Sequence, residues 1–121
     1  MSRVFSVHVA MLYLCCIGAV HADSSTHAFV LGSIEAEAGT TASGYLEVPR
    51  GVDQATRIPV SVIHGARPGP TLALVAGTHG YEYPPITALQ RLRGSLDPAR
   101  LSGTILMVHV ANPPSFLGRT I

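Results

Sequence analysis

The stretch Thr71-Leu-Ala-Leu-Val-Ala-Gly-Thr-His-Gly-Tyr-Glu82 decides how the rest of this chain is interpreted. Its first six residues, 71–76, are mostly apolar and uncharged, and Gly77 ends the run. A continuous apolar run bounded by Gly and Pro is typical of a strand that is buried on both faces of a parallel sheet. His79 and Glu82 follow, and open α/β sheets bind their ligands at the carboxyl ends of such strands. We therefore expect a functional site at this turn.

A helix and a second strand are predicted to follow the turn. Pro84 and Pro85 suit the first turn of a helix, and Gly94 is a typical stop signal. The apolar positions of this segment recur at helical spacing and are Ile86, Leu89 and Leu92. Residues 104–111 form another β-branched apolar run, which predicts a second buried strand. Strand, helix and strand at this spacing form a βαβ unit, so the expected fold class is α/β.

Two shorter strands are predicted before the opening stretch. Tyr45–Val48 and Arg57–Ile63 alternate between polar and apolar residues. Pro59 cannot donate to a ladder on both sides, so its strand is expected at or near a sheet edge. Gly65–Pro70 has the composition of a turn. So compact a turn predicts that the two strands it joins are antiparallel neighbours.

The N-terminus has the order of a secretory signal peptide. Arg3 is a positive start, residues 9–20 are apolar and uncharged, and Val20-His21-Ala22 offers small residues for cleavage. The apolar segment is shorter than the roughly 20 residues that a membrane-spanning helix needs. We expect cleavage after Ala22 and a secreted or periplasmic protein without a stable membrane span; an uncleaved anchor is the alternative.

The remaining chain divides into a leader and a domain. Residues 23–44 are rich in Ser, Thr, Ala and Gly and predict a leader with one short edge strand at Phe29–Leu31. Residues 45–121 hold the strong patterns, and 112–119 have the composition of a loop. About four strands fall below the usual size of a doubly wound sheet. We expect residues 45–121 to be the first part of a larger, incomplete domain.

Cysteine usage and charge exclude several classes of function. Both cysteines, Cys15 and Cys16, lie in the predicted signal peptide, so the mature chain would have no disulfide and no cysteine zinc site. Without residues 1–22 the chain has seven Arg, seven acidic residues and no Lys. Nothing in this balance resembles a nucleic-acid-binding surface or a polybasic membrane surface. The expected partner is a small molecule.

His79 and Glu82 are candidate metal ligands, because residues three apart on a helical turn point to one side. Zinc accepts an imidazole nitrogen and a carboxylate oxygen, and a catalytic zinc needs a third protein ligand and an open water position. Such an ion lowers the pKa of its bound water to about 7. A single His-x-x-Glu pattern is weak evidence. His64 and His109 are expected to be structural or solvent-facing, and Asn112 is expected to shape a turn.

Three motifs occur in order along the chain: Gly65-Ala66-Arg67-Pro68-Gly69-Pro70-Thr71-Leu72, Ala76-Gly77-Thr78-His79-Gly80-Tyr81-Glu82 and Val110-Ala111-Asn112-Pro113-Pro114-Ser115-Phe116. Together they resemble the opening of the succinylglutamate desuccinylase/aspartoacylase family, relatives of the zinc carboxypeptidases. The resemblance implies the N-terminal part of a doubly wound, mixed and mostly parallel sheet of zinc-carboxypeptidase type, incomplete here. It also implies a zinc hydrolase acting on amide or ester bonds of acylated small molecules. In that family His79 and Glu82 would be two of three zinc ligands, and Arg119 would match a substrate-binding Arg.

The chain departs from the family pattern in two ways. Tyr81 stands where an acidic or amide residue is usual. The third zinc ligand, an Asn-Arg substrate-binding segment and a general-base Glu have no counterpart before Ile121. We expect no turnover from this chain by itself, because two ligands without a base do not complete a site. A non-catalytic truncated product and a carboxypeptidase-like peptidase are the alternatives.

Overall fold

The structure, a computed structural model, describes residues 27–121. The predicted signal peptide, residues 1–22, lies outside this range. No helix among the described residues is long and apolar enough to cross a membrane. In chain order the elements are β1 (Phe29–Leu31), β2 (Ile34–Ala36), β3 (Thr40–Val48), β4 (Thr56–His64), β5 (Arg67–Val75), α1 (Tyr83–Ser95), the 3-10 helix η1 (Pro98–Arg100), β6 (Ser102–Val108) and α2 (Pro113–Gly118).

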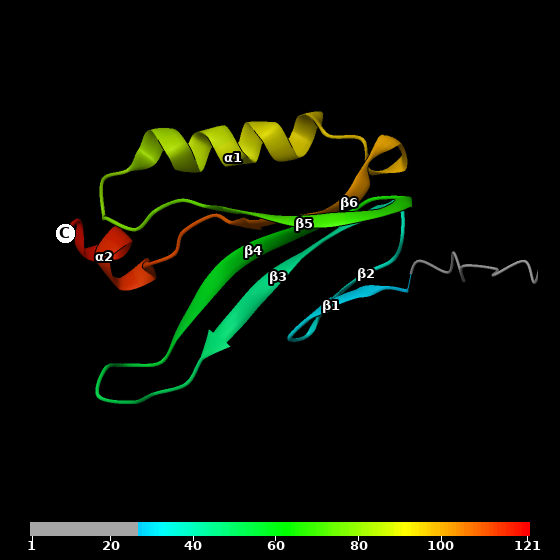
Figure 1. The fold of residues 1–121 in the computed structure, drawn as a ribbon. Helices are drawn as coiled ribbons and strands as arrows, with labels where there is room; N and C mark the ends of the chain where they lie inside the picture. The colour runs from blue at the N-terminus through cyan, green and yellow to red at the C-terminus, as the bar shows by residue number, and fades with distance from the viewer. Residues whose placement is uncertain (1–26) are drawn as a thin grey trace, which may run out of the picture.

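A four-stranded mixed sheet with the order β3-β4-β6-β5 forms the centre of the fold. The β5 and β6 strands are parallel and α1 connects them, which confirms the predicted βαβ unit. The α/β class and the mixed sheet are also confirmed. Within residues 27–121, parallel pairing is limited to β5 and β6, because β3–β4 and β4–β6 are antiparallel. The α1 helix lies on one face of this sheet and the β1–β2 hairpin on the other (Figure 1).

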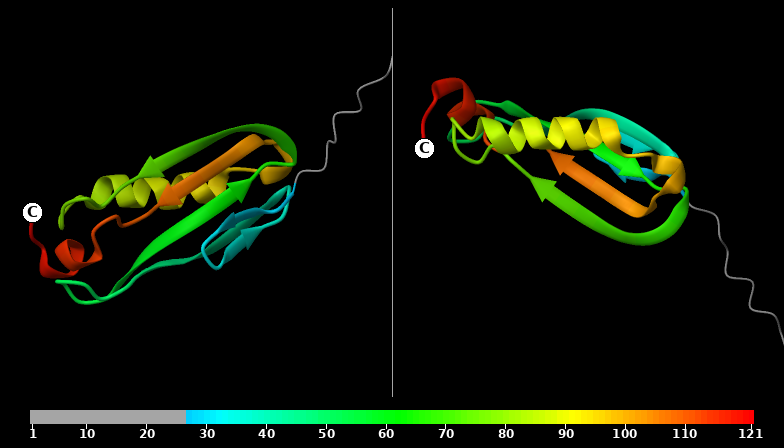
Figure 2. Two further views of the ribbon diagram at one scale, coloured as in Figure 1. Left: turned by 60° about the horizontal axis from the view of Figure 1, so that its bottom comes forward. Right: turned by 90° about the horizontal axis from the view of Figure 1, so that it is seen from above.

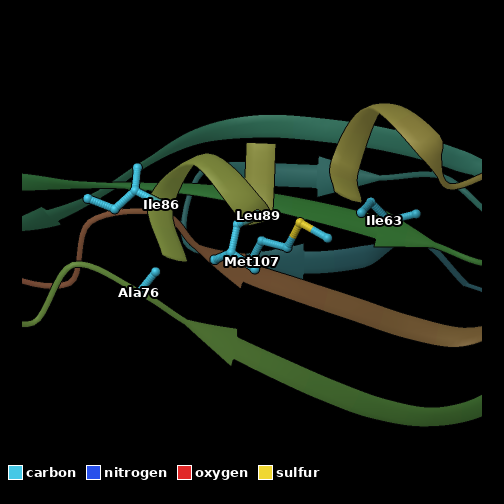
Figure 3. Packing of buried hydrophobic residues seen from close by; sticks show 5 residues of the cluster. All are labelled: Ile63, Ala76, Ile86, Leu89 and Met107. Carbon is cyan, nitrogen blue, oxygen red and sulfur yellow. The ribbon is translucent and has the colours of Figure 1, made fainter. Parts of the chain in front are cut away.

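Two hydrophobic clusters, one on each face of the sheet, hold these layers together. The cluster under α1 consists of Ile63, Ala76, Ile86, Leu89 and Met107 (Figure 3). The cluster under the hairpin consists of Ile34, Ala36, Val60 and Val62. Alternate side chains of β4 enter opposite clusters, so this strand is buried on both faces. Burial of each large apolar side chain stabilises the fold by about 1.5–3 kcal/mol.

The prediction of an edge position for the strand around Pro59 is wrong, because β4 lies between β3 and β6. The last residue pair between β4 and β6 is Val60 with Val108, and Pro59 lies just beyond it. The Pro59 carbonyl still accepts a hydrogen bond from the His109 N–H at 3.0 Å. An interior strand tolerates this proline because its missing N–H falls at the end of the ladder.

The predicted antiparallel pairing across the 65–70 turn is also wrong, because β6 lies between β4 and β5. The turn is shorter than its composition suggested, since Arg67–Pro70 already belongs to β5. The Gly65 N–H donates to the Gly103 carbonyl at 2.8 Å. A Cβ atom at Gly65 would collide with the Leu101 and Gly103 backbone, so glycine at this position permits the close approach of the segment that starts β6.

The β5 strand is not buried on both faces, contrary to the prediction for residues 71–76. It lies at the edge of the four-stranded sheet, and Leu72 and Val75 are 54% and 60% exposed. Within β5 only Leu74 packs against the cluster under α1, and Ala76, just after the strand, is buried in it. An apolar run therefore predicted the strand correctly but not its place in the sheet.

Two segments contain more regular structure than the sequence predicted. Residues 23–44 contain β1, β2 and the start of β3, where one short strand was expected. The hairpin forms because Ile34 and Ala36 alternate with Glu35 and cover the Val60–Val62 face of β4. Residues 112–119, expected to be a loop, contain α2.

Candidate metal centre

His79 and Glu82 lie in the turn between β5 and α1, at the carboxyl end of the strand. The Glu82 N–H donates to the His79 carbonyl at 3.4 Å and closes this turn. The predicted placement of both side chains on one side is confirmed, although a turn produces it and not a helix. The arrowheads of β5 and β6 point to the end of the sheet where α2 and the C-terminus lie (Figure 2).

The two side chains contact each other directly. His79 Nδ1 lies 2.9 Å from Glu82 Oε1, and the His79 backbone N–H donates to Glu82 Oε2 at 3.1 Å. The backbone bond orients the carboxylate and leaves Oε1 facing the imidazole. Together the two side chains offer an imidazole nitrogen and a carboxylate oxygen, a donor set that fits zinc, so His79 and Glu82 are the residues that would hold such an ion.

The charge state of Glu82 suits metal binding. Hydrogen bonds from the His79 backbone N–H and then from the His79 side chain hold the pKa of Glu82 below its ordinary value. The carboxylate is consequently ionised at neutral pH, as a metal ligand must be. The side chains of His79 and Glu82 are 47% and 39% exposed, so water and a small solute can reach both.

Backbone hydrogen bonds attach this turn to the segment after β6. Gly77 adopts a φ of 68°, where a side chain would be strained, and this turns the chain away from β5. Gly80 packs against α2 so closely that a Cβ atom would collide with the backbone of Ser115 and Thr120. The turn that holds His79 and Glu82 is therefore positioned by residues about 30–40 positions further along the chain. The bonds run from Ala111 N–H to the Ala76 carbonyl at 2.8 Å, from Asn112 N–H to the Gly77 carbonyl at 3.0 Å and from Gly80 N–H to the Thr120 carbonyl at 2.7 Å.

Asn112 supports this arrangement by capping α2. Its Oδ1 accepts a hydrogen bond from the Ser115 N–H at 3.2 Å, and Pro113 follows at the first helical position. Both features are favourable at a helix N-terminus. The prediction that Asn112 shapes the turn after its strand is confirmed. The short helix then brings Thr120 to Gly80.

Arg119 ends α2 in the left-handed conformation, with a φ of 52°. A non-glycine residue in this region costs about 1–3 kcal/mol, and such strain clusters at functional sites. Arg119 is exposed and precedes Thr120, which contacts Gly80 in the turn that holds His79 and Glu82. Its role in substrate binding stays a prediction. Within residues 27–121 no third His, Cys, Asp or Glu joins His79 and Glu82.

The histidines predicted to be structural lie away from this pair. His64 is buried, and its Nδ1 and Nε2 lie 2.8 Å from Thr104 Oγ1 and 3.1 Å from the His27 carbonyl. His109 Nε2 lies 2.8 Å from the buried Ser61 Oγ. Sequence patterns did not predict either contact, because each joins residues of different strands.

Stability is expected to decrease in acid through His109. Burial, and then the positive charge of Arg93, hold the pKa of His109 below its ordinary value of 6.5. The unfolded chain therefore binds this proton more readily than the folded chain, and stability is full above pH 6.5 and falls below it. Chemical denaturation of wild type and His109→Gln between pH 7.5 and 5 tests this. The variant should lose less stability over this range, and parallel curves would contradict the assignment.

Comparisons with known proteins show similarity in sequence and in fold. The family described as Succinylglutamate desuccinylase/Aspartoacylase catalytic domain matches residues 68–120. N-alpha-acetyl-L-2,4-diaminobutyric acid deacetylase of Halomonas elongata is 34% identical over 90 residues, which are 71% of this chain and 26% of that protein.

Solved structures show the same similarity. An aspartoacylase family protein of Mesorhizobium loti is 31% identical with a TM-score of 0.57. The product-bound ectoine utilization protein EutE (DoeB) of Ruegeria pomeroyi is 27% identical with a TM-score of 0.58, and the succinylglutamate desuccinylase/aspartoacylase of Rhodobacter sphaeroides is 28% identical with a TM-score of 0.55. Each match covers 66% of this chain and 26% of the other.

The mixed α/β sheet, the match over residues 68–120 and the similar solved structures together support the succinylglutamate desuccinylase/aspartoacylase family. The chain spans about a quarter of the length of the relatives it matches, 26% in each case.

Proposed function

We propose that this chain forms the metal-binding N-terminal part of a zinc-dependent deacylase that hydrolyses an amide or ester bond of an acylated small molecule. The main support is the approach of His79 Nδ1 and Glu82 Oε1 to 2.9 Å at the carboxyl end of β5. This turn lies inside the region that matches the family's catalytic domain. The match to a deacetylase of a small acetylated amino acid supports the substrate class.

In the proposed site His79 provides Nδ1 and Glu82 provides Oε1 as two of three metal ligands. The His79 backbone N–H holds the other carboxylate oxygen, so the ligand keeps one orientation. When bound, a zinc ion supplies Lewis-acid polarisation of a carbonyl oxygen and makes water nucleophilic near neutral pH. Arg119 is proposed to bind a carboxylate or carbonyl oxygen of the substrate, for which a guanidinium is well suited.

A chimera tests the proposal. The 90 residues that match the Halomonas elongata deacetylase replace the matching segment of that enzyme. We expect the chimera to release acetate from N-alpha-acetyl-2,4-diaminobutyrate, to lose this activity after dialysis against a chelator and to regain it with zinc. Calorimetric titration of the unfused chain with zinc measures metal binding by His79 and Glu82 independently of the chimera.

The substrate panel distinguishes the proposal from its alternatives. It contains small amines acylated with acetyl or succinyl groups and, in parallel, dipeptides with a free C-terminus. Preferred cleavage of the dipeptides would favour a carboxypeptidase-like peptidase. A folded chimera without activity towards any substrate, together with no zinc binding by the chain, would favour a non-catalytic product.

A further inference from the structure

A cavity lies apart from His79 and Glu82, on the side of the sheet that faces α1. It has a volume of about 460 Å³, within the range typical of small-molecule sites. Neither His79 nor Glu82 lines it. Its polar lining comes from four elements that the fold brings together: Ser43 from β3, Ser61 from β4, Gln90 and Arg93 from α1, and His109 after β6.

A chain of hydrogen bonds crosses the floor of this cavity. Ser43 Oγ lies 2.9 Å from Ser61 Oγ, and Ser61 Oγ lies 2.8 Å from His109 Nε2. The two serines are direct partners across β3 and β4. Among the described residues, His109 Nδ1 is buried without a hydrogen-bond partner. The tautomer of His109 therefore sets the direction in which the hydroxyl groups of Ser61 and Ser43 donate their hydrogen bonds.

Nδ1 has no hydrogen-bond partner in either tautomer, so its burial does not choose between them. Donation from Ser43 to a ligand requires the tautomer with the proton on Nε2, the nitrogen that contacts Ser61. With the proton on Nε2, His109 donates to Ser61 and Ser61 donates to Ser43. The Ser43 hydroxyl then has its own proton free to donate into the cavity.

The charged lining of the cavity is positive only. Arg93 lines it, and no Asp or Glu is among its lining residues. Within residues 27–121, Arg93 has no ion-pair partner, since the pair formed by His79 and Glu82 is the one salt bridge there. The remaining wall is largely apolar and includes Tyr45 and Pro59. A ligand that fits has a negative oxygen group at one end and an apolar body at the other.

We propose that this cavity binds a small organic carboxylate, which pairs with the Arg93 guanidinium and accepts a hydrogen bond from Ser43. Charge-assisted bonds from a guanidinium to a carboxylate are among the strongest in proteins. The apolar body of the ligand lies against Tyr45 and Pro59. The site does not depend on the proposed deacylase activity, because neither metal ligand contributes to it.

Carbon-detected shifts of the His109 ring in the full chain test the proposal, with sodium benzoate as the probe at constant ionic strength. We expect a saturable change in the His109 Cε1–Hε1 signal, and nitrogen shifts that show the Nε2–H tautomer. Arg93→Gln should weaken binding at least about tenfold, since it removes the charge-assisted pair. Ser43→Ala should weaken it less and leave the bond between His109 and Ser61 intact. Arg91→Gln, exposed on the same helix and outside the cavity, is the matched control and should bind as wild type does.

The neutral isostere benzamide and inorganic phosphate complete the experiment. Benzamide should produce no saturable change, because it lacks the charge that Arg93 pairs with. Phosphate should bind more weakly than benzoate, because it cannot use the apolar wall. Equal binding of benzamide, equal binding of phosphate, an unchanged affinity in Arg93→Gln, or no saturable response to benzoate would each overturn the proposal.

Discussion

Replacing His79 by alanine in the chimera is expected to reduce deacetylation at least about 1,000-fold. Loss of a metal ligand removes several kcal/mol of transition-state stabilisation, and each 1.36 kcal/mol corresponds to about a factor of ten in rate. The fold should remain intact, because the His79 side chain is 47% exposed and its ion pair with Glu82 is at the surface. Initial rates with N-alpha-acetyl-2,4-diaminobutyrate, measured with saturating zinc, give the ratio directly.

Two further variants make this result specific. Glu82→Gln should lose activity to a similar extent, because it keeps the shape of the side chain and removes its charge. Glu35→Gln is the matched control, since Glu35 is an exposed carboxylate on β2, in the hairpin away from the metal turn. Activity in His79→Ala within a factor of about three of wild type, with all three variants equally stable, would be incompatible with a metal ligand at this position.

Replacing Gly80 by alanine is expected to destabilise the chain by about 3 kcal/mol. The added Cβ atom would collide with the backbone of Ser115 and Thr120, which cannot move aside as a flexible side chain would. Overpacking typically costs about 1–3 kcal/mol, and loss of the bond from Gly80 N–H to the Thr120 carbonyl adds about 1 kcal/mol. Urea denaturation measures the difference in unfolding free energy.

Gly94 offers a matched glycine-to-alanine control. No atom lies within 4 Å of a Cβ built at this position, and the residue is inside α1. Gly94→Ala should therefore stabilise the chain by about 0.5–1 kcal/mol, because alanine favours helix more than glycine does. Zinc titration adds a second measurement, since displacing the turn in Gly80→Ala should also weaken metal binding. Equal stability of the two variants would show that α2 does not pack against the metal turn.

Local patterns predicted the central βαβ unit and the start of its helix well, although α1 continues through the predicted stop at Gly94 to Ser95. The apolar run before Gly77, the helix opened by Pro84 and the second strand all occur in the expected order. Asp97 caps η1, with its Oδ1 accepting from the Ala99 N–H at 3.0 Å. These features depend on contacts between residues close in sequence, so composition and spacing are sufficient to predict them.

Strand order could not be predicted in the same way. The edge position expected for β4 and its expected pairing with β5 were both wrong, because β6 inserts between them. Pro59 lacks an N–H and cannot donate to a neighbouring strand, as predicted. The end of the ladder between β4 and β6 accommodates this missing donor as well as a sheet edge would. Which strand lies beside β4 depends on burial summed over both faces, and no local pattern contains that sum.

The candidate site also has features that the sequence indicated and features that only the tertiary structure decided. The sequence by itself indicated His79 and Glu82 as candidate metal ligands, since they are three residues apart after a strand, and three ordered motifs indicated the family resemblance. Tertiary structure alone decided how the pair is held, through Gly80 against α2 and through the backbone bonds to residues 111, 112 and 120. It also brought Ser43, Ser61 and His109 together around a cavity. The physical reason is range. The spacing of the candidate ligands is set by a few adjacent residues, whereas these contacts form only when β3, β4, β6 and β5 share one sheet.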